Sequence, residues 1–460
     1  MLFLKTERML KFLKIHVTPR VYIPVILLLI TFITYGNSLP NKLFFDDEEL
    51  IYKNEYVKNL AFFPRYFTEN MIAGAGKVSN MYRPVLLTSF ALDYFVWKGN
   101  PFGFHLTNIL LHATNGILLF SLTYFLFKNL LLSFLTSLLF IIHPVNSEAI
   151  IYSSGRTDPL FVFFSLLTFH FFLIFIKEKK RYFYFVSLLT FIIALLSKEV
   201  AVVIPFILIL LSVTYRKKLK TKAAELCYFF IPFFLFDIGY ISLRLTVLNF
   251  SNTLNFYSTP SVYSQNILVR FFTFTHAFFT YLSILFFPKD LIIARSAPII
   301  TSFVSPSVIL FLLFFFFLFF LSLLSWRKEK LPLFSFCFFF LTLLPVSGII
   351  PINNMITEHY LYFPSVGFFL FLSYCILFVS RYFSSIWMKY VFISIITFLI
   401  MSLSFRTIIR TFDWRDPITF YTRSLVQSPW HIPMRHNLAL AYAEEGEYAR
   451  AIFEYKKIIE

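Results

Sequence analysis

The sequence predicts an all-α protein: a polytopic bundle of membrane-spanning helices followed by a short helical C-terminal segment. Hydrophobic residues make up 58% of the 460 residues and charged residues only 14%, whereas about 25% of the residues of a soluble domain are charged. Aromatic residues account for 21% of the chain, and 67 of them are Phe. One soluble core cannot hide that much apolar surface from water. The composition therefore excludes an ordinary soluble domain.

Eleven apolar stretches are candidates for helices that cross a bilayer, which takes about 20 mostly apolar residues. Several are shorter than this or nearly contiguous. The eleven stretches are roughly 21–36, 104–127, 130–144, 159–176, 182–197, 199–215, 226–244, 300–325, 331–350, 360–380 and 387–405. A further apolar stretch, about 269–287, breaks the alternation of sides. We expect it to enter and leave the membrane by one side or to lie along the surface.

Basic residues set the predicted orientation. The net charge of +17 comes from Lys and Arg gathered in short runs between apolar stretches, as in cytoplasmic loops. This distribution argues against a nucleic-acid partner. We expect a cytoplasmic N-terminus and an extracytoplasmic C-terminus, in a bacterial inner membrane or the endoplasmic reticulum. The segments predicted on the outer face are 37–103, 145–158, 245–299, 351–359 and everything after about 406.

The chain divides into two predicted parts. Residues 1–406 form the membrane domain, with a long first outer loop at 37–103, and residues 407–460 form a polar helical tail. The spacing of small and aromatic residues in this tail is typical of a tetratricopeptide repeat. The positions concerned are Asn437, Leu438, Ala439, Tyr442, Gly446, Ala451 and Tyr455. One such unit is an incomplete repeat that cannot bury its own face. An ordinary amphipathic hairpin is the alternative interpretation.

The first outer loop carries a pair of carboxylates directly after the first apolar stretch. Asp46 and Asp47 at a membrane surface suit a general base that takes the proton of a hydroxyl, with its neighbour orienting it. The alternative is that they only cap and solubilise a loop helix. Later in the loop, Arg83 precedes another apolar stretch. It is a candidate for a bidentate phosphate contact, or an anchor for an interfacial helix.

Further polar clusters fall at predicted outer ends of spans. They contain His143, Glu148, Arg156 and Asp158, then Lys198 and Glu199, and finally Glu358 and His359. Five basic residues on the predicted outer side oppose the positive-inside bias, so they are candidates for holding an anionic phosphate: Arg83, Arg156, Lys198, Arg244 and Arg295. Internal ion pairs such as Arg156–Asp158 and Lys198–Glu199 are the competing account. We expect Asp46, Asp47, Glu148, Arg156 and Asp158 to converge on one outer-face cavity.

Several kinds of chemistry find no support in the sequence. It contains no Gly-rich phosphate loop, no Cys/His metal spacing and no Gly-x-Ser-x-Gly elbow. We therefore assign no metal site, and whether a divalent cation is needed stays open. Polar chemistry on the outer face requires a donor that reaches that side, and a lipid-phosphate-linked donor does so.

In order along the chain, these motifs resemble the transmembrane-and-tetratricopeptide-repeat O-mannosyltransferases. The resemblance rests on Asp46-Asp47, Tyr82-Arg83-Pro84, Pro101 with His105-Leu106-Thr107-Asn108 and His112, His143-Pro144 with Glu148 and Gly155-Arg156-Thr157-Asp158, Lys198-Glu199, and Glu358-His359-Tyr360-Leu361-Tyr362-Phe363-Pro364-Ser365. Each motif is weak alone, but six in order are fairly specific. His359 departs from the family, whose members often carry Arg at this position.

The resemblance implies an integral-membrane glycosyltransferase of the class-C fold that uses a polyprenyl-phosphate-linked sugar, typically mannose. Asp46 or Asp47 would be the base, and Arg83, Arg156 and Lys198 would bind the donor phosphate. His143, Glu148, Asp158, Glu199, Glu358 and His359 would support them. An aromatic groove would hold the prenyl chain, and the repeat segment would recruit a protein whose Ser or Thr hydroxyl accepts the sugar.

Two alternatives to this function remain open. One is a transferase that acts on a lipid or a surface polysaccharide. The other is a transporter or scaffold in which the repeats bind a partner. A transporter places charged residues at mid-membrane near broken helices, whereas here they collect at the ends of spans.

Overall fold

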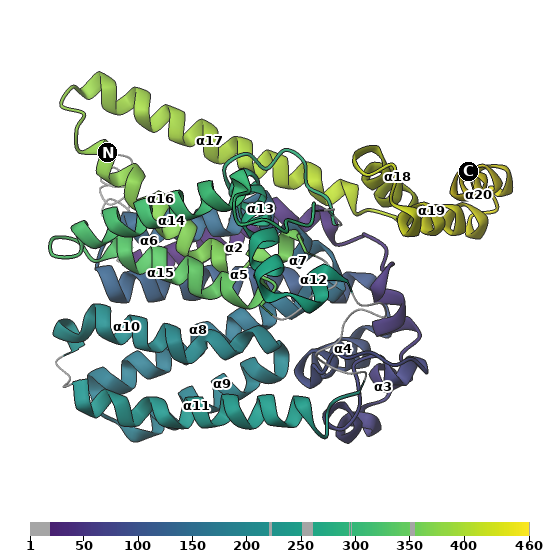
Figure 1. Cartoon of the computed structure of the whole chain (residues 1–460), viewed down its shortest axis with the longest axis horizontal. Helices are drawn as coiled ribbons and strands as arrows, with labels where there is room; N and C mark the ends of the chain where they lie inside the picture. The colour runs from purple at the N-terminus through teal and green to yellow at the C-terminus, as the bar shows by residue number, and fades with distance from the viewer. Residues whose placement is uncertain are drawn as a thin grey trace, which may run out of the picture.

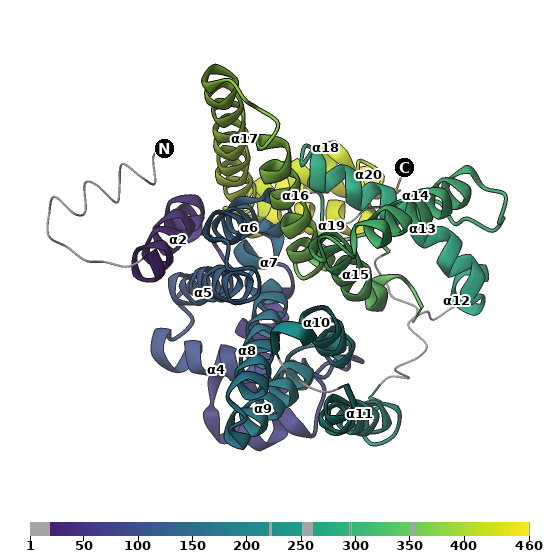
Figure 2. The ribbon, with the colours of Figure 1, turned by 90° about the vertical axis from the view of Figure 1, so that its left-hand side faces the viewer.

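The computed structural model describes residues 19–219, 223–250, 261–293, 295, 297–349 and 355–459. Within these ranges the chain is helical, and the only pairing of extended backbone is an isolated bridge between Arg295 and Ile356. Long helices lie side by side in Figure 1, and many are viewed nearly end-on in Figure 2. The structure thus confirms the predicted all-α polytopic class.

The helices of the bundle follow the predicted apolar stretches closely. They are α2 (Pro19–Tyr35), α5 (Pro101–Phe127), α6 (Leu130–Ile142), α8 (Thr157–Glu178), α9 (Arg181–Ser197), α10 (Ile204–Leu219), α11 (Ala223–Leu245), α14 (Pro306–Ser325), α15 (Leu331–Leu343), α16 (Pro364–Ser380) and α17 (Ile386–Asp413). Asn side chains cap several starts, as Asn100 does for α5 and Asn129 for α6. These caps satisfy amide groups that a helix start leaves without intrahelical partners.

Seven of the described helices are long and apolar enough to cross a membrane. A bent pair formed by α6 and the segment that contains α7 (Ser147–Ile151) would be an eighth span. Five shorter apolar helices accompany them. Six of the seven, the bent pair and four of the shorter helices correspond to the expected spans. The chain is therefore a multi-pass membrane protein, whereas the count of eleven spans stays a prediction.

The seventh qualifying helix, α13 (Ile267–Phe286), is the stretch that breaks the alternation. Near its start, Arg270 Nη2 donates to the carbonyl of Ile349 at 3.1 Å. Towards its end, Tyr281 Oη donates to the carbonyl of Met355 at 3.4 Å. Both acceptors lie in the single connection between α15 and α16. Two parts of the helix thus contact this connection, while its length and composition also allow a crossing, so its path relative to the membrane stays a prediction.

The first long loop folds into its own small unit. It contains a π-helical turn η2 (Glu48–Tyr52), α3 (Glu55–Lys58), a 3-10 helix η3 (Leu60–Phe67) and α4 (Pro84–Trp97). Ile51, Val57 and Phe90 pack together in its apolar core. The buried Asn54 side chain donates to the carbonyl of Met71, which fixes two distant parts of the loop. This unit provides a rigid support for the acidic pair.

Helix α17 continues beyond the expected end of its apolar stretch at residue 405, to Asp413. The extension carries polar side chains that find partners inside the protein. Thr407 Oγ1 donates to the carbonyl of Ile142 at 2.6 Å, and Arg410 is buried. Because these polar groups are satisfied or enclosed, the helix does not need to end where its apolar residues do.

Three helices follow α17, namely α18 (Pro417–Gln427), α19 (Ile432–Glu444) and α20 (Tyr448–Ile459), and they project from one end of the bundle (Figure 1). Ala439 and Ala451 are buried in this helical segment. Gly446, in the turn between α19 and α20, adopts a φ of 80°, which glycine tolerates without strain. A paired-helix unit is present, while its assignment as a tetratricopeptide repeat stays a prediction.

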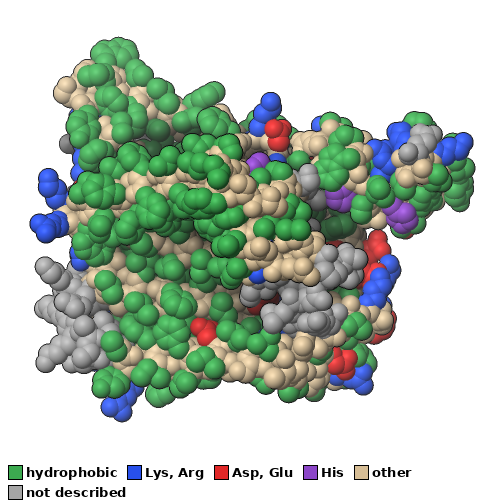
Figure 3. All heavy atoms as spheres, viewed as in Figure 1, with side chains coloured by type: hydrophobic (Ala, Val, Ile, Leu, Met, Phe, Trp, Pro, Cys, Tyr) green, Lys and Arg blue, Asp and Glu red, His purple; other side chains and the backbone are tan. Residues whose placement is uncertain are grey.

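The visible face of the molecule is apolar between two charged ends (Figure 3). Hydrophobic side chains cover most of the bundle, Lys and Arg stand at its left edge, and the acidic side chains gather mainly on the right. Such a band matches a hydrocarbon layer bounded by polar interfaces. Which side faces the cytoplasm stays a prediction, and the basic N-terminal segment 1–18 lies outside the described residues.

Candidate active site

The backbone around the acidic pair is unusual. Phe45, directly before Asp46, has a φ of 62°, a left-handed conformation that is costly for a bulky side chain. The π-helical turn Glu48–Tyr52 begins directly after Asp47. Strained residues and π-helical turns are both enriched at functional sites. The local backbone thus sets these two carboxylates apart from the other acidic residues of the loop.

Asp47 is the buried member of the pair, with 2% of its surface exposed. Its Oδ1 accepts hydrogen bonds from the Ser154 amide at 2.7 Å and from the Ser154 hydroxyl at 2.5 Å. Burial raises the pKa of Asp47 to about 7, although the hydrogen bonds from Ser154 act in the opposite direction. The carboxyl therefore changes its charge near neutral pH, where a carboxyl group is otherwise fully ionised.

Asp46 is the accessible member. Its side chain reaches the surface, yet protein encloses it closely enough that desolvation raises the pKa of its carboxyl. Two neighbouring side chains, Tyr152 and His359, favour the ionised form and limit this shift of the pKa. A carboxyl that is accessible but poorly solvated is suited to accept a proton from a bound molecule.

Glu148 and His359 form a second pair of groups beside Asp46. Glu148 lies in α7 and is almost fully buried, and its Oε1 accepts from His359 Nδ1 at 2.7 Å. The His359 amide donates to the other carboxylate oxygen at 3.3 Å. His359 stays 27% exposed. His143, in contrast, lies within hydrogen-bonding distance of the carbonyl of Leu285, 3.1 Å from Nε2, so it connects two segments of the bundle.

The three candidate phosphate ligands have carboxylate partners within the protein. Arg156 is fully buried, and its Nη2 lies 2.5 Å from Asp93 and also donates to the carbonyl of Phe104. Its Nε donates to Asn108 and its Nη1 to Ser89. Lys198 Nζ meets both oxygens of Asp158 at 2.7 and 2.9 Å. Arg83 meets Glu199 at 2.8 Å. Ion pairs are thus present, but they join different elements instead of the sequence neighbours Arg156–Asp158 and Lys198–Glu199.

Glu358 is fully buried between Arg295, one of the outward-facing basic residues predicted to hold a phosphate, and Arg410, which sequence reasoning did not select. Its carboxylate oxygens lie 3.5 Å from Arg295 Nη2 and 3.8 Å from Arg410 Nη2. Asp93, Tyr152 and Ser154 were likewise missed. Two of the missed residues could have been found in the sequence. Asp93 is the one charge in the apolar stretch 85–96, and Arg410 shares a helix face with Arg406 at i, i+4 spacing.

An aromatic cluster connects the acidic pair to the C-terminal helices. The Phe44 ring lies 5.3 Å from that of Phe420 in α18, and Phe420 lies 4.3 Å from Trp414. Trp414 in turn stacks on Tyr152 at 5.3 Å. Aromatic packing thus joins the C-terminal helices to the loop that holds Asp46 and to the neighbouring Tyr152.

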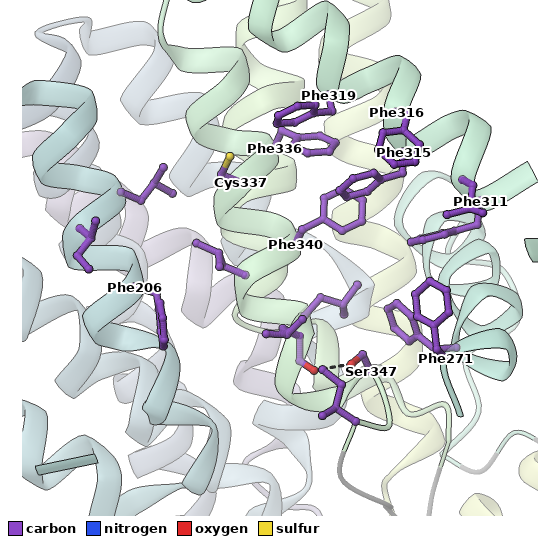
Figure 4. A pocket seen from close by; sticks show the side chains of 18 of the residues that line it. Phe206, Phe271, Phe311, Phe315, Phe316, Phe319, Phe336, Cys337, Phe340 and Ser347 are labelled. Carbon is purple, nitrogen blue, oxygen red and sulfur yellow. Dashed lines mark hydrogen bonds between the residues drawn. The ribbon is translucent and has the colours of Figure 1, made fainter. Parts of the chain in front are cut away.

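A large apolar cavity lies between α10, α13, α14 and α15 (Figure 4). Its volume is about 680 Å³. Phe271, Phe311, Phe315 and Phe340 project into the space, and Cys337 stands on its wall. Ser347 and Ile349 line it where α15 leads into the connection to α16. The cavity is suited to a long hydrocarbon chain. For a metal ion, no group of three or more His, Cys, Asp or Glu side chains within the described ranges is suitably arranged.

Comparison with known proteins agrees with the resemblance in the motifs. A protein O-mannosyl-transferase of Caenorhabditis elegans is 24% identical over 440 residues, 92% of this chain and 60% of its own length. The mouse protein O-mannosyl-transferase TMTC4 is 23% identical over 507 residues, 96% of this chain and 67% of that protein. Human TMTC1 is 36% identical over 140 residues, 29% of this chain and 16% of that protein. No family model matches the chain.

These relatives confirm the recognition made from the motifs: the chain is similar over most of its length to the transmembrane-and-tetratricopeptide-repeat O-mannosyltransferases. It spans about 60% of the length of the nematode relative.

Proposed function

We propose that this TMTC-like membrane protein is a glycosyltransferase that moves a sugar, mannose by analogy with its relatives, from a polyprenyl phosphate to a Ser or Thr hydroxyl of a protein. The reaction takes place at the end of the bundle where Asp46 lies, which we assign to the outer face. The observation that carries the proposal is the accessible but poorly solvated carboxyl of Asp46, held beside Glu148 and His359.

In the proposed reaction Asp46 accepts the proton of the acceptor hydroxyl as the hydroxyl oxygen attacks the anomeric carbon. The new bond forms on the face opposite the leaving group, so the anomeric configuration inverts. The bond between the sugar and the phosphate oxygen breaks, and the lipid phosphate leaves with the electron pair. Asp47 does not face the acceptor in this scheme. Its hydrogen bonds with Ser154 hold the loop that positions Asp46.

In this proposal the three cations Arg83, Arg156 and Lys198 have a structural role. Arg83, Arg156 and Lys198 were selected from the sequence as phosphate ligands or ion-pair partners, and their contacts favour the second role. Arg156 in particular directs three of its nitrogens to protein acceptors and meets Asp93 as well. We therefore propose that these cations fix the loops around Asp46 instead of contacting the donor.

We place the prenyl chain of the donor in the apolar cavity shown in Figure 4. Burying hydrocarbon there removes apolar area from water, at roughly 25 cal/mol per Å². Helix α13 contributes both to this cavity and, through Tyr281, to the segment that carries Glu358 and His359. A donor whose chain lies along α13 has its phosphate near this segment.

The test is direct transfer by the purified full chain. The protein in detergent is incubated with polyprenyl-phosphate mannose or polyprenyl-phosphate glucose, with and without EDTA, and with Ser/Thr-rich peptides from extracytoplasmic proteins. Mass spectrometry should find hexose on the peptide with the mannose donor, and none with Asp46→Asn. A glycosylated lipid in place of a peptide would reassign the acceptor, and transfer by Asp46→Asn at the wild-type rate would remove the proposed base.

A further inference from the structure

The connection between α15 and α16 meets the end of α17 at a group of buried charges. Glu358 is fully buried there, and Arg410 of α17 has a side chain that is 5% exposed. Arg295 approaches from the segment after α13, aligned by its bridge to Ile356. Arg406 lies one turn before Arg410 and donates to the carbonyl of Lys289. Arg295 and Arg410 thus flank one carboxylate, and Arg406 lies one turn away from Arg410.

The contacts within this group are poor for ion pairs. Guanidinium and carboxylate groups in good contact stand 2.7–2.9 Å apart, whereas Glu358 lies 3.5 Å from Arg295 and 3.8 Å from Arg410. Among the described residues, no acceptor forms a hydrogen bond with Arg295 Nε or with Nε and Nη2 of Arg410. The indole N–H of Trp414, beneath the Arg410 guanidinium, likewise has no acceptor there. Arg410 Nη1 does donate to Asp413 at 3.3 Å. Within the described part of the chain, four buried donor atoms nevertheless have no hydrogen bond, and neither do the two Glu358 oxygens between the arginines.

Buried donors without acceptors cost free energy, and native proteins leave few of them. A phosphate group supplies several strong acceptor oxygens at once and matches the fork of a guanidinium. Glu358 does not oppose such an anion strongly, because burial raises the pKa of its carboxyl and so favours the neutral form. A neutral carboxyl can also donate a hydrogen bond to a phosphate oxygen.

The place of the group relative to the proposed base also suits a leaving phosphate. Trp414 stacks on Tyr152, the residue whose side chain contacts Asp46. His359, which is adjacent to Glu358 in the chain, is close enough to influence the charge of Asp46. Tyr152 and His359 thus connect Asp46, the proposed base, to the group that contains Arg295 and Arg410.

We propose that Arg295 and Arg410, together with the indole N–H of Trp414, bind a phosphate group, which we assign to the lipid-linked sugar donor. The assignment of the ligand to a lipid rests on the proposed function, while the anion site itself rests on the unpaired donors. The sequence-based candidates Arg83, Arg156 and Lys198 meet carboxylates at 2.8, 2.5 and 2.7 Å. Arg295 and Arg410 meet theirs at longer distances of 3.3 to 3.8 Å.

The experiment measures ligand affinity in the full purified chain by isothermal titration, with thermal melts of every variant. The probes are inorganic phosphate, a short-chain prenyl phosphate and a long polyprenyl phosphate. The variants are Arg295→Gln and Arg410→Gln, with Arg381→Gln, an exposed arginine that follows α16, as the control. Because Arg410→Gln removes a buried charge, Arg410→Lys provides a milder second variant.

We expect Arg295→Gln and Arg410→Gln each to weaken the binding of both prenyl phosphates about tenfold or more, the loss typical of one hydrogen bond to a charged group. Arg410→Lys should lose part of this affinity, and Arg381→Gln should keep it. Glu358→Gln should bind the phosphates at least as tightly as the wild type, because the Gln amide cannot carry a negative charge and can still donate a hydrogen bond to a phosphate oxygen. Folded variants at both arginines with wild-type affinity would overturn the site.

Further outcomes separate this site from the proposed function. If the wild type transfers sugar and the arginine variants bind the donor with wild-type affinity, the phosphate site is overturned and the proposed function is not. Arginine-dependent binding of prenyl phosphate by a protein that transfers no sugar supports the site and overturns the proposed function. Equal affinity for inorganic phosphate and both prenyl phosphates supports an anion site but overturns its assignment to the lipid donor.

Discussion

Asp47 accepts two hydrogen bonds from Ser154, one from the amide at 2.7 Å and one from the hydroxyl at 2.5 Å. The residues stand 107 positions apart, in the loop after α2 and in the turn that leads into α8. This contact fixes the backbone beside Asp46 to the bundle. It also separates the roles of the two carboxylates, because one is enclosed by hydrogen bonds and the other is left accessible.

Asp46→Asn should abolish most of the transfer with little effect on folding. A general base contributes roughly 10²- to 10⁴-fold to a rate, so kcat should fall by about that factor while donor affinity stays near the wild-type value. The exposed Asp46 side chain makes no packing contact that Asn cannot reproduce. Donor binding and turnover are measured in parallel. A fall in donor affinity that accounts for the whole loss would contradict a role in proton transfer.

Asp47→Asn should change how stability depends on pH. The pKa of Asp47 is about 7 in the folded protein and about 3.9 for an unfolded chain. The folded state therefore holds a proton that the unfolded state releases, and wild-type stability falls as pH rises from about 4 to 7, by an amount on the order of a few kcal/mol. Asn cannot titrate, so the variant should lose this part of the slope.

Thermal melts in detergent between pH 4.5 and 7.5 check this prediction. Asp290→Asn serves as a control, because it removes an exposed carboxyl group that follows α13 and lies outside the acidic pair. A wild-type protein that gains stability from Asp47 as pH rises through this range would mean that the folded state prefers the ionised carboxyl.

Arg156→Ala should destabilise the protein without a matching change in donor KM. Removing one partner of a buried ion pair typically costs about 3–5 kcal/mol, and here it leaves the Asp93 carboxylate without its cation. Arg156→Lys should recover only part of this loss, because an ammonium cannot reach Asp93, Asn108 and Phe104 together. Melts and donor titrations are compared. A stable Arg156→Ala protein whose donor KM rises tenfold would restore the phosphate-ligand hypothesis.

The helices could be predicted from the sequence, since apolar runs bounded by basic clusters have few alternatives in a membrane. The acidic pair was also recognisable from its place after the first run. The partners of the cations were not. Lys198 pairs with Asp158, 40 residues away, and Arg83 with Glu199, 116 residues away. Such pairs depend on which helix ends meet in space, so charge patterning suggests neighbours in the sequence instead.

Arg410 shows a second limit of sequence reasoning. It lies where hydropathy ends the last span, so it reads as the polar flank of a helix. The structure encloses it because α17 continues past that point and packs against the connection that carries Glu358. A hydropathy profile locates the end of an apolar segment. The helix can continue past that point, and other parts of the protein can still bury its side chains.

The aromatic contact between Phe420 and Phe44 should matter more for activity than the salt bridge between the same parts of the chain. Phe420 is buried, and Phe→Ala in such a site typically costs 3–5 kcal/mol. The Lys42–Glu445 pair is exposed, and such pairs contribute about 0–1 kcal/mol. Phe420→Ala should therefore loosen the loop that holds Asp46 and lower turnover, and Lys42→Ala should leave turnover unchanged. Equal effects of both variants would argue against aromatic coupling.

A bulky side chain in the apolar cavity should raise the KM for donors with a long prenyl chain more than for donors with a short one. Cys337 stands on the cavity wall (Figure 4), so Cys337→Trp places a large ring where the prenyl chain would lie. The KM for a long polyprenyl donor should rise about tenfold, because roughly 1.4 kcal/mol of apolar contact is lost. A donor with one or two isoprene units should be used almost as well as by the wild type. Cys375→Trp, at a cysteine of the neighbouring helix α16 that does not line the cavity, controls for added bulk. If both donors lose efficiency equally, the ring has disturbed the fold or the reacting end, and the prenyl chain lies elsewhere.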